Sequence, residues 1–419
     1  MTALLLTQLL VILVVARCCG WILRYVGQPP VIGEMAAGLL LGPIAFGALA
    51  PDLHETLFPA ASLGPLSALA TLGLILFMFI VGVEMRPVEG PRSQVRAAAT
   101  VGVLGISLPL LLGLAASWWL HPRFAPAGVG FWPFALFIAA AMSVTAFPVL
   151  ARILKDRGLT QTRPGRLSLG AAVIDDAFVW IFLALVMTFT GGAGKYGVPV
   201  IAAGASGMAA VCFLLLKPLY ARLLASNGPA REGVGQRALV MILVGLLGCT
   251  AFAEAIGLHA VFGAFVFGAC LPRDDRLVAY FTKAFEPLSM LLLMPIVFAL
   301  AGLNTTPDAF TGAGPGAFAL ILAVAIAGKL VGGMVGARVS GYGWRDSFAV
   351  GALINSRGLM ELIVLKIGLD AGLIGPALFT MLFGMALVTT VMTAPLLALW
   401  TRRERPHLDD LEPLNRSHS

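Results

Sequence analysis

Apolar residues fill most of the chain in long runs, which are separated by short polar segments or by segments with proline and glycine. A helix of about 20 apolar residues is long enough to cross the hydrocarbon core of a bilayer. The pattern predicts an all-α polytopic membrane protein with about thirteen transmembrane helices. The expected spans are 2–26, 30–50, 61–83, 97–120, 131–154, 166–190, 197–224, 236–256, 257–272, 281–303, 313–339, 346–370 and 374–400. The boundary between the eighth and ninth spans is the least marked, because only Ile256 and Gly257 separate them.

Composition agrees with this interpretation. Of 419 residues, 59% are hydrophobic and 12% charged, with a mean hydropathy of +0.94, whereas soluble domains contain about 25% charged residues. The net charge of +7 comes from basic residues spread over short loops, so no nucleic-acid partner is expected. The five cysteines lie in apolar runs without a CxxC pair or a His/Cys cluster, which predicts neither disulfides nor a structural metal. No motif for nucleotide hydrolysis or another catalytic reaction occurs, so neither an enzyme nor a cofactor is expected.

Basic residues mark every second connection between the predicted spans. Cytoplasmic loops are enriched in lysine and arginine. These connections, and with them the C-terminal tail (401–419), are therefore expected on the cytoplasmic side of a plasma-membrane protein, and thirteen spans place the N-terminus outside. The residues concerned are Arg24, Arg86, Arg92, Arg96, Arg152, Lys155, Arg157, Arg163, Arg166, Arg222, Arg231, Arg237, Arg273, Arg276, Lys283, Arg338, Arg345, Arg402, Arg403 and Arg405.

Two adjacent acids, Asp175 and Asp176, interrupt the apolar stretch 167–189. One carboxylate in the middle of a bilayer costs about 3 kcal/mol on insertion scales, and ionisable groups there are usually functional. The pair therefore predicts a site that carries an ion or a proton. The alternative is a buried, paired polar site without a role in transport.

Two cations also lie deep within predicted spans. Lys329 is in the eleventh span and needs a carboxylate partner, for which Asp175 or Asp176 is the candidate; alternatively, it stabilises helix ends without a role in transport. Arg357 in the twelfth span is followed one helical turn later by Glu361. Residues at this spacing share a helix face, so an internal ion pair is expected.

Polar residues and a proline interrupt two spans. Pro148 follows Ser143 and Thr145 in the fifth span, and proline frees a backbone carbonyl that the two hydroxyls can join around a cation. In the twelfth span the break is Asn355, Ser356, Arg357 and Gly358. Seven spans separate the two breaks, so the broken helices run in opposite directions, as two inverted repeats require. A plain proline kink and a polar helix contact are the alternative.

Six segments, taken in order, resemble the sodium/proton exchanger family, in its second branch of monovalent cation:proton antiporters. The segments are PPVIGEMAAGLLLGP (29–43), SVTAFPVLARIL (143–154), GAAVIDDAFVWIFLAL (170–185), GLHAVFGAFVFGACLPR (257–273), GKLVGG (328–333) and INSRGLMEL (354–362). The resemblance implies an exchanger domain over 1–400 that is built from two inverted repeats with crossed broken helices. It implies a core (97–190 and 313–400), a dimerisation domain (1–83 and 236–303), a linker helix (197–224) and a homodimer.

The resemblance also implies roles for individual residues. Asp176 would bind either a monovalent cation or protons, Asp175 would pair with Lys329, and Thr145 and the unwound backbone near it would complete the site. The expected function is exchange of Na⁺ or K⁺ for H⁺ across the bilayer, with an Asp-Asp pair favouring electrogenic exchange. The alternative is a gated potassium efflux pathway that depends on a separate regulatory subunit.

Overall fold

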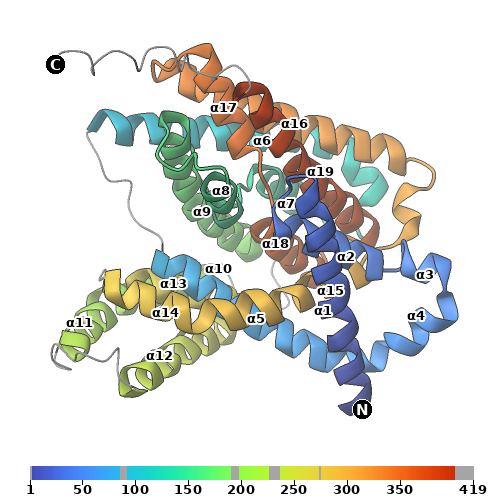
Figure 1. The fold of residues 1–419 in the computed structure, drawn as a ribbon, viewed down its shortest axis with the longest axis horizontal. Coiled ribbons are helices and arrows are strands. Elements are labelled where there is room, and N and C mark those ends of the chain that lie inside the picture. Colours follow the sequence, from blue (N-terminus) through green and yellow to red (C-terminus); the bar gives the residue numbers. More distant parts are fainter. Residues whose placement is uncertain (1, 85–91, 190–197, 226–235, 273–274, 402–419) are drawn as a thin grey trace, which may run out of the picture.

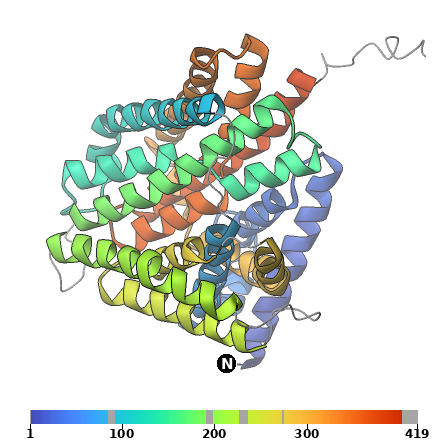
Figure 2. The ribbon, with the colours of Figure 1, turned by 90° about the vertical axis from the view of Figure 1, so that its left-hand side faces the viewer.

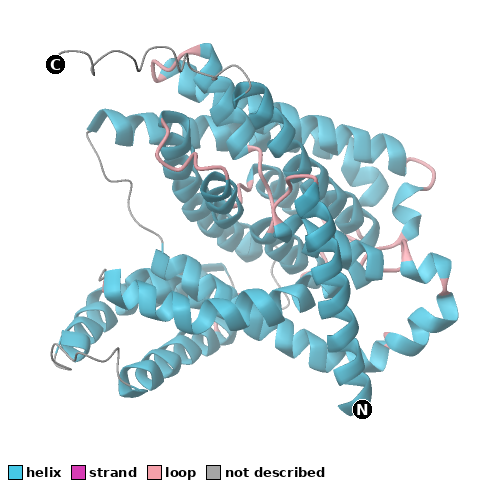
Figure 3. Ribbon diagram, viewed as in Figure 1, coloured by secondary structure: helices cyan, strands magenta, loops and turns pink. Residues whose placement is uncertain are grey.

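The computed structural model describes residues 2–401 except 85–91, 190–197, 226–235 and 273–274. The described residues form helices joined by short loops, and no strand occurs among them (Figure 3). Some residues that carry the orientation prediction lie outside the described part, namely Arg86, Arg231, Arg273 and the tail from residue 402.

Each predicted span corresponds to one helix or to a group of consecutive helices. The elements are α1 (Thr2–Tyr25), α2 (Pro30–Leu41), α3 (Phe46–Leu49), α4 (Pro51–Leu57), η1 (Ala60–Ser62), α5 (Leu63–Glu84), α6 (Arg92–Phe124), α7 (Phe131–Ser143), α8 (Phe147–Asp156), α9 (Arg163–Phe189), α10 (Val198–Ala210), η2 (Val211–Leu216), α11 (Lys217–Ala225), α12 (Gln236–Ala255), α13 (Ala260–Cys270), α14 (Asp275–Leu288), η3 (Ser289–Leu293), α15 (Met294–Leu303), η4 (Pro307–Phe310), α16 (Gly314–Val339), α17 (Trp344–Ile354), α18 (Leu359–Asp370) and α19 (Pro376–Thr401). Within the described residues, nine spans are long and apolar enough to cross a membrane, or ten if α17 and α18 count as one. The figure of thirteen crossings stays a prediction.

Two boundaries show how local sequence ends a helix. The predicted span 30–50 is not one helix: α2 ends at Leu41, because Gly42 is extended and the following Pro43 has no N–H to continue the ladder. The weakly marked boundary between the eighth and ninth spans falls at Gly257, whose φ of +84° suits glycine. Beyond it, the Glu254 carboxylate accepts a hydrogen bond from the Ala260 N–H at 3.0 Å, which caps the start of α13.

The helices pack in two groups (Figure 1). Helices α6 to α9 and α16 to α19 pack mainly on one another, and α6 and α16 make the most extensive contact. The second group comprises α1, α2, α5 and α12 to α15. Helix α10 contacts α9 of the first group and α12 of the second, and Figure 2 shows α11 and α12 at the bottom of the side that faces the viewer.

Glycines allow backbones to touch within both groups. A Cβ on Gly302 of α15 would lie 1.7 Å from the carbonyl oxygen of Gly38 in α2. Between α16 and α6, a Cβ on Gly336 would lie 2.7 Å from the Cα of Val101. Small residues that let backbones approach closely are the main means of helix association in a membrane. The GxxxG segments 38–42 and 332–336 both lie in such contacts.

We expect Gly302→Ala to lower the stability of the detergent-solubilised protein by about 1–3 kcal/mol, the usual cost of overpacking. Backbone atoms cannot move aside as a flexible side chain can, so the new methyl group must separate α2 from α15. Gly248→Ala in α12 is the matched control, because a Cβ there meets nothing within 4 Å. Thermal unfolding followed by tryptophan fluorescence compares them, and equal melting temperatures would contradict the assigned contact.

Candidate ion-binding site

The two sequence-predicted breaks meet in the first group of helices. Helix α7 ends at Ser143, Val144 and Ala146 are extended, and α8 starts at Phe147 with Pro148 in its first turn, where a missing N–H costs little. Helices α17 and α18 are bent by 44° at the second break. The Ala146 N–H donates to the Ser356 carbonyl oxygen across 3.3 Å, so the unwound segments touch.

Helix α9 brings the aspartate pair to this crossing. The side chains of Asp175 and Asp176 are both buried. The Lys329 ammonium of α16 lies 2.8 Å from Asp175 Oδ2 and donates to Thr145 Oγ1 at 2.7 Å, and the Thr145 hydroxyl donates to the same carboxylate oxygen at 2.5 Å. Of the two candidate partners for Lys329, the structure therefore places Asp175 against it.

Asp176 stands apart from that pair. Both of its carboxylate oxygens are buried and have no hydrogen-bond partner among the residues that the structure describes. Asn355 Oδ1 in the second break is likewise buried without a partner there. A buried charge without compensation costs several kcal/mol, so Asp176 is suited to hold a proton or a cation.

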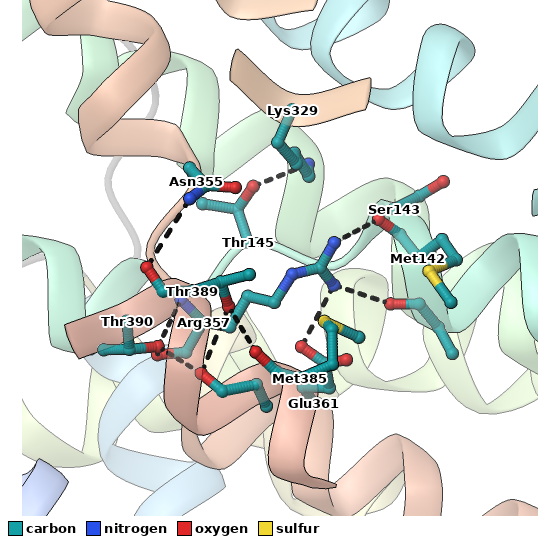
Figure 4. A network of polar contacts seen from close by, with 12 residues as sticks. Met142, Ser143, Thr145, Lys329, Asn355, Arg357, Glu361, Met385, Thr389 and Thr390 are labelled. Atoms are coloured by element: carbon teal, nitrogen blue, oxygen red, sulfur yellow. Dashed lines mark hydrogen bonds and ion pairs between the residues drawn. The ribbon is translucent and has the colours of Figure 1, made fainter. Parts of the chain in front are cut away.

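Arg357 joins the two breaks (Figure 4). Its guanidinium lies 3.0 Å from Glu361 Oε2, and it donates to the carbonyl oxygens of Ala141 at 2.9 Å and Met142 at 2.6 Å. The last carbonyls of a helix have no intrahelical partner and carry partial negative charge. Arg357 therefore satisfies the end of α7 while it neutralises Glu361.

Helix α19 holds the second break in place, which the sequence did not predict. The Thr390 hydroxyl accepts a hydrogen bond from the backbone N–H of Arg357 at 3.0 Å and lies 2.7 Å from the backbone carbonyl oxygen of the same residue. The Asn355 amide donates to the Thr389 carbonyl oxygen at 3.5 Å (Figure 4). The available signal is the adjacent polar pair Thr389-Thr390 within a largely apolar span.

Other residues singled out in the breaks make local contacts. The Ser143 hydroxyl donates to the carbonyl oxygen of Ala139 at 2.8 Å and lies 3.3 Å from that of Ile106, and Ser356 bonds to Leu353 at 2.8 Å. Serine hydroxyls often bond back to the preceding turn in this way. Gly358 precedes α18, and a Cβ there would lie 2.7 Å from Val149 Cγ2, so glycine lets α8 and α18 approach.

A cavity of about 760 Å³ runs beside the first half of α9. Its lining includes Gly170 and Val173 of α9, so it comes within two residues of Asp175 along that helix. Arg163, Arg166 and Asp346 also line it, which places it on the side with the basic connections.

We expect Lys329→Met to cost about 3–5 kcal/mol of stability, because it leaves the Asp175 carboxylate buried without its cation. Adding Asp175→Asn should restore much of the loss, since no uncompensated charge then remains at that position. Melting temperatures of the two variants and of wild type in one detergent measure the effect. A double variant no more stable than Lys329→Met would contradict an ion pair as the source.

Comparison with known proteins gives one family. The family model described as the transmembrane sodium/hydrogen exchanger matches residues 11–399. The Na⁺/H⁺ antiporter NhaS4 of Synechocystis is 38% identical over 94% of this chain and 96% of that protein. The K⁺/H⁺ antiporter 1 of Saccharomyces cerevisiae is 34% identical over 89% of this chain but only 43% of its own length. The chain likewise spans about half the length of several plant relatives.

A solved structure shows the same fold. The sodium proton antiporter MjNhaP1 of Methanocaldococcus jannaschii superposes with a TM-score of 0.70 over 96% of this chain and 99% of that one, at 16% sequence identity.

Proposed function

The chain belongs to the sodium/hydrogen exchanger family, and from this premise we propose that it is a secondary antiporter that exchanges Na⁺ or K⁺ for H⁺ by alternating access. The cation and the proton compete for Asp176. The observation that carries the proposal is the buried Asp176 carboxylate, neither of whose oxygens has a partner among the described residues, whereas the neighbouring Asp175 is paired with Lys329 through its Oδ2. The proposed role is transport and not catalysis.

The charges around the crossing support a single monovalent occupant. Lys329 offsets Asp175 and Arg357 offsets Glu361, which leaves one negative charge, that of Asp176. One proton or one Na⁺ or K⁺ neutralises it, and the two cannot occupy the same carboxylate oxygens together. Competition of this kind couples the opposing movements of the two ions, provided the site changes its side of access only when occupied.

Oxygen atoms for a cation are available at the crossing. Hard monovalent cations are coordinated by carboxylate, carbonyl and hydroxyl oxygens. Asp176, the backbone of the unwound segment near Thr145 and the Asn355 amide oxygen are the candidate ligands. We assign Ser143 a supporting role, because its hydroxyl bonds within the end of α7.

The packing groups suggest how access alternates. We assign α6 to α9 and α16 to α19 to the core that carries the site, and α1 to α5 and α12 to α15 to a dimerisation domain, with α10 and α11 between them. The extensive contacts within each group support this division. In this scheme the core moves against the dimerisation domain of a homodimer in the plasma membrane, with the N-terminus outside and the C-terminus in the cytoplasm.

The test is proton flux in proteoliposomes with an imposed pH gradient, inside acidic. Sodium chloride, potassium chloride and choline chloride are added in turn, and the internal pH is followed with a trapped dye. We expect saturable collapse of the gradient with Na⁺ or K⁺ and none with choline. Potassium flux without proton movement would contradict the antiporter and favour a gated efflux pathway.

A further inference from the structure

A second cavity, of about 490 Å³, lies where the two packing groups meet. The α1–α2 turn supplies Gly27 and Gln28, and the opposite wall comes from α8 and α19. Two hydrogen bonds cross this junction: Arg157 donates to the Gly27 carbonyl oxygen at 3.3 Å, and the Gln28 amide donates to that of Val391 at 3.1 Å.

Three arginines line this cavity: Arg24 of α1, Arg152 of α8 and Arg157 at the end of α8. No carboxylate occurs among the described residues that line it. Glu34 lines an adjoining cavity of about 80 Å³, pairs with Arg17 at 3.3 Å and interacts electrostatically with Arg152 as well. One carboxylate thus faces two arginines, and Arg24 and Arg157 add further positive charge. The cavity is therefore electropositive.

Aromatic residues indicate how deep the cavity lies. Trp21 and Tyr25 stack edge to face at 4.8 Å on α1 and are 62% and 73% exposed. Exposed tryptophan and tyrosine gather at the membrane–water interface, and Arg24 lies between them in the sequence. Pro29, Pro30 and Ile153 give the cavity an apolar wall. The cavity thus combines cations at headgroup depth with a surface that suits the start of an acyl chain.

We propose that this cavity, which we call the arginine pocket (Arg24, Arg152 and Arg157), binds the phosphate group of an anionic phospholipid. Basic pockets between transmembrane helices on the cytoplasmic side bind anionic headgroups, and guanidinium groups match phosphate oxygens in pairs. Its volume lies within the usual range of small-ligand sites, about 300–1,000 Å³.

A bound headgroup would link the moving parts. Arg152 belongs to the half-helix that begins at the first break and Arg157 directly follows its last residue, whereas Arg24 belongs to the other packing group. A phosphate held by both sides therefore favours the arrangement in which α8 and the α1–α2 turn are close. This consequence rests on the proposed function, and anionic lipid should then change the exchange rate.

The experiment measures lipid-dependent melting of the purified full-length protein. Phosphatidylglycerol is titrated into neutral detergent micelles, with phosphatidylcholine as the zwitterionic control and inorganic phosphate as the soluble one. Arg24→Gln with Arg157→Gln is the test variant. Arg92→Gln with Arg96→Gln makes the same charge change at exposed positions of α6 outside the pocket.

We expect phosphatidylglycerol, but not phosphatidylcholine, to raise the melting temperature of wild type and of the α6 control. The phosphatidylglycerol concentration that gives half of the increase in melting temperature should be about 30-fold higher in the test variant, at about fivefold for each arginine lost near the headgroups. With lysine at both positions it should return to within about threefold of the wild-type value. An equal response of test and control variants would overturn the pocket. A response to inorganic phosphate alone would overturn the lipid assignment, and no response to any additive would overturn both. The melting temperature does not depend on transport. This experiment therefore tests lipid binding even if the protein does not exchange Na⁺ or K⁺ for H⁺.

Discussion

Asp176→Asn is expected to abolish cation-driven proton movement in proteoliposomes while the melting temperature stays equal to that of wild type or rises. The amide has nearly the same shape but neither ionises nor holds a charge for a cation. Losing a buried charge partner costs about 3–5 kcal/mol, which corresponds to a loss of cation affinity of roughly 100- to 4,000-fold. Stability should not suffer, because the change removes an uncompensated buried charge beside Asp175.

Asp370→Asn is the matched control for this variant. Asp370 is also a membrane-domain aspartate, but it lies at the exposed end of α18, paired with Lys366. Surface pairs are worth about 0–1 kcal/mol, so exchange should continue at close to the wild-type rate. If Asp176→Asn exchanged ions normally, the ion-binding site could not be at Asp176, but the family assignment would still hold.

Arg357→Met is expected to lower stability about as much as Lys329→Met, by about 3–5 kcal/mol. It leaves Glu361 charged and buried, and it leaves the carbonyl groups of Ala141 and Met142 without their donor. Arg338→Met is the control, because Arg338 lies at a helix end, 5.2 Å from the ring of Trp344, where such a contact is worth about 0.5–1 kcal/mol. Thermal unfolding in one detergent compares both variants with wild type.

The double variant Arg357→Met with Glu361→Gln separates the two causes. It removes the buried charge but not the unsatisfied carbonyls, so it should recover part of the lost stability and not all of it. If Arg357→Met alone were as stable as wild type, Arg357 would not be the residue that holds the two breaks together.

The sequence predicted the breaks and the charged residues because their signals are local. Pro148 cannot continue a helix ladder, Asn355 to Gly358 interrupt an apolar run, and a charge in such a run is visible without a structure. The spacing of Arg357 and Glu361 also places them on one helix face. These local signals indicated where two helices break, and in the structure the breaks between α7 and α8 and between α17 and α18 fall at these segments.

Contacts between distant segments could not be predicted in the same way. Asp175 and Asp176 are chemically identical, and only the placement of α9 relative to Lys329 of α16 decides which of them pairs with that lysine. The bonds from Arg357 to α7, and from Thr390 to Arg357, depend on which helices are neighbours. The early end of α2 at Leu41 could have been predicted from Gly42-Pro43.

The hydrogen bonds shared by the two breaks have a consequence for leakage. Ala146 is bonded to Ser356, and the Arg357 guanidinium is bonded to the carbonyl groups at the end of α7. A movement of one half-helix by itself would break these bonds in a medium that offers no substitute partners. The two broken helices must therefore move together. Slippage, in which an ion passes through a half-opened intermediate without counter-transport, is penalised by the same bonds that shape the binding site.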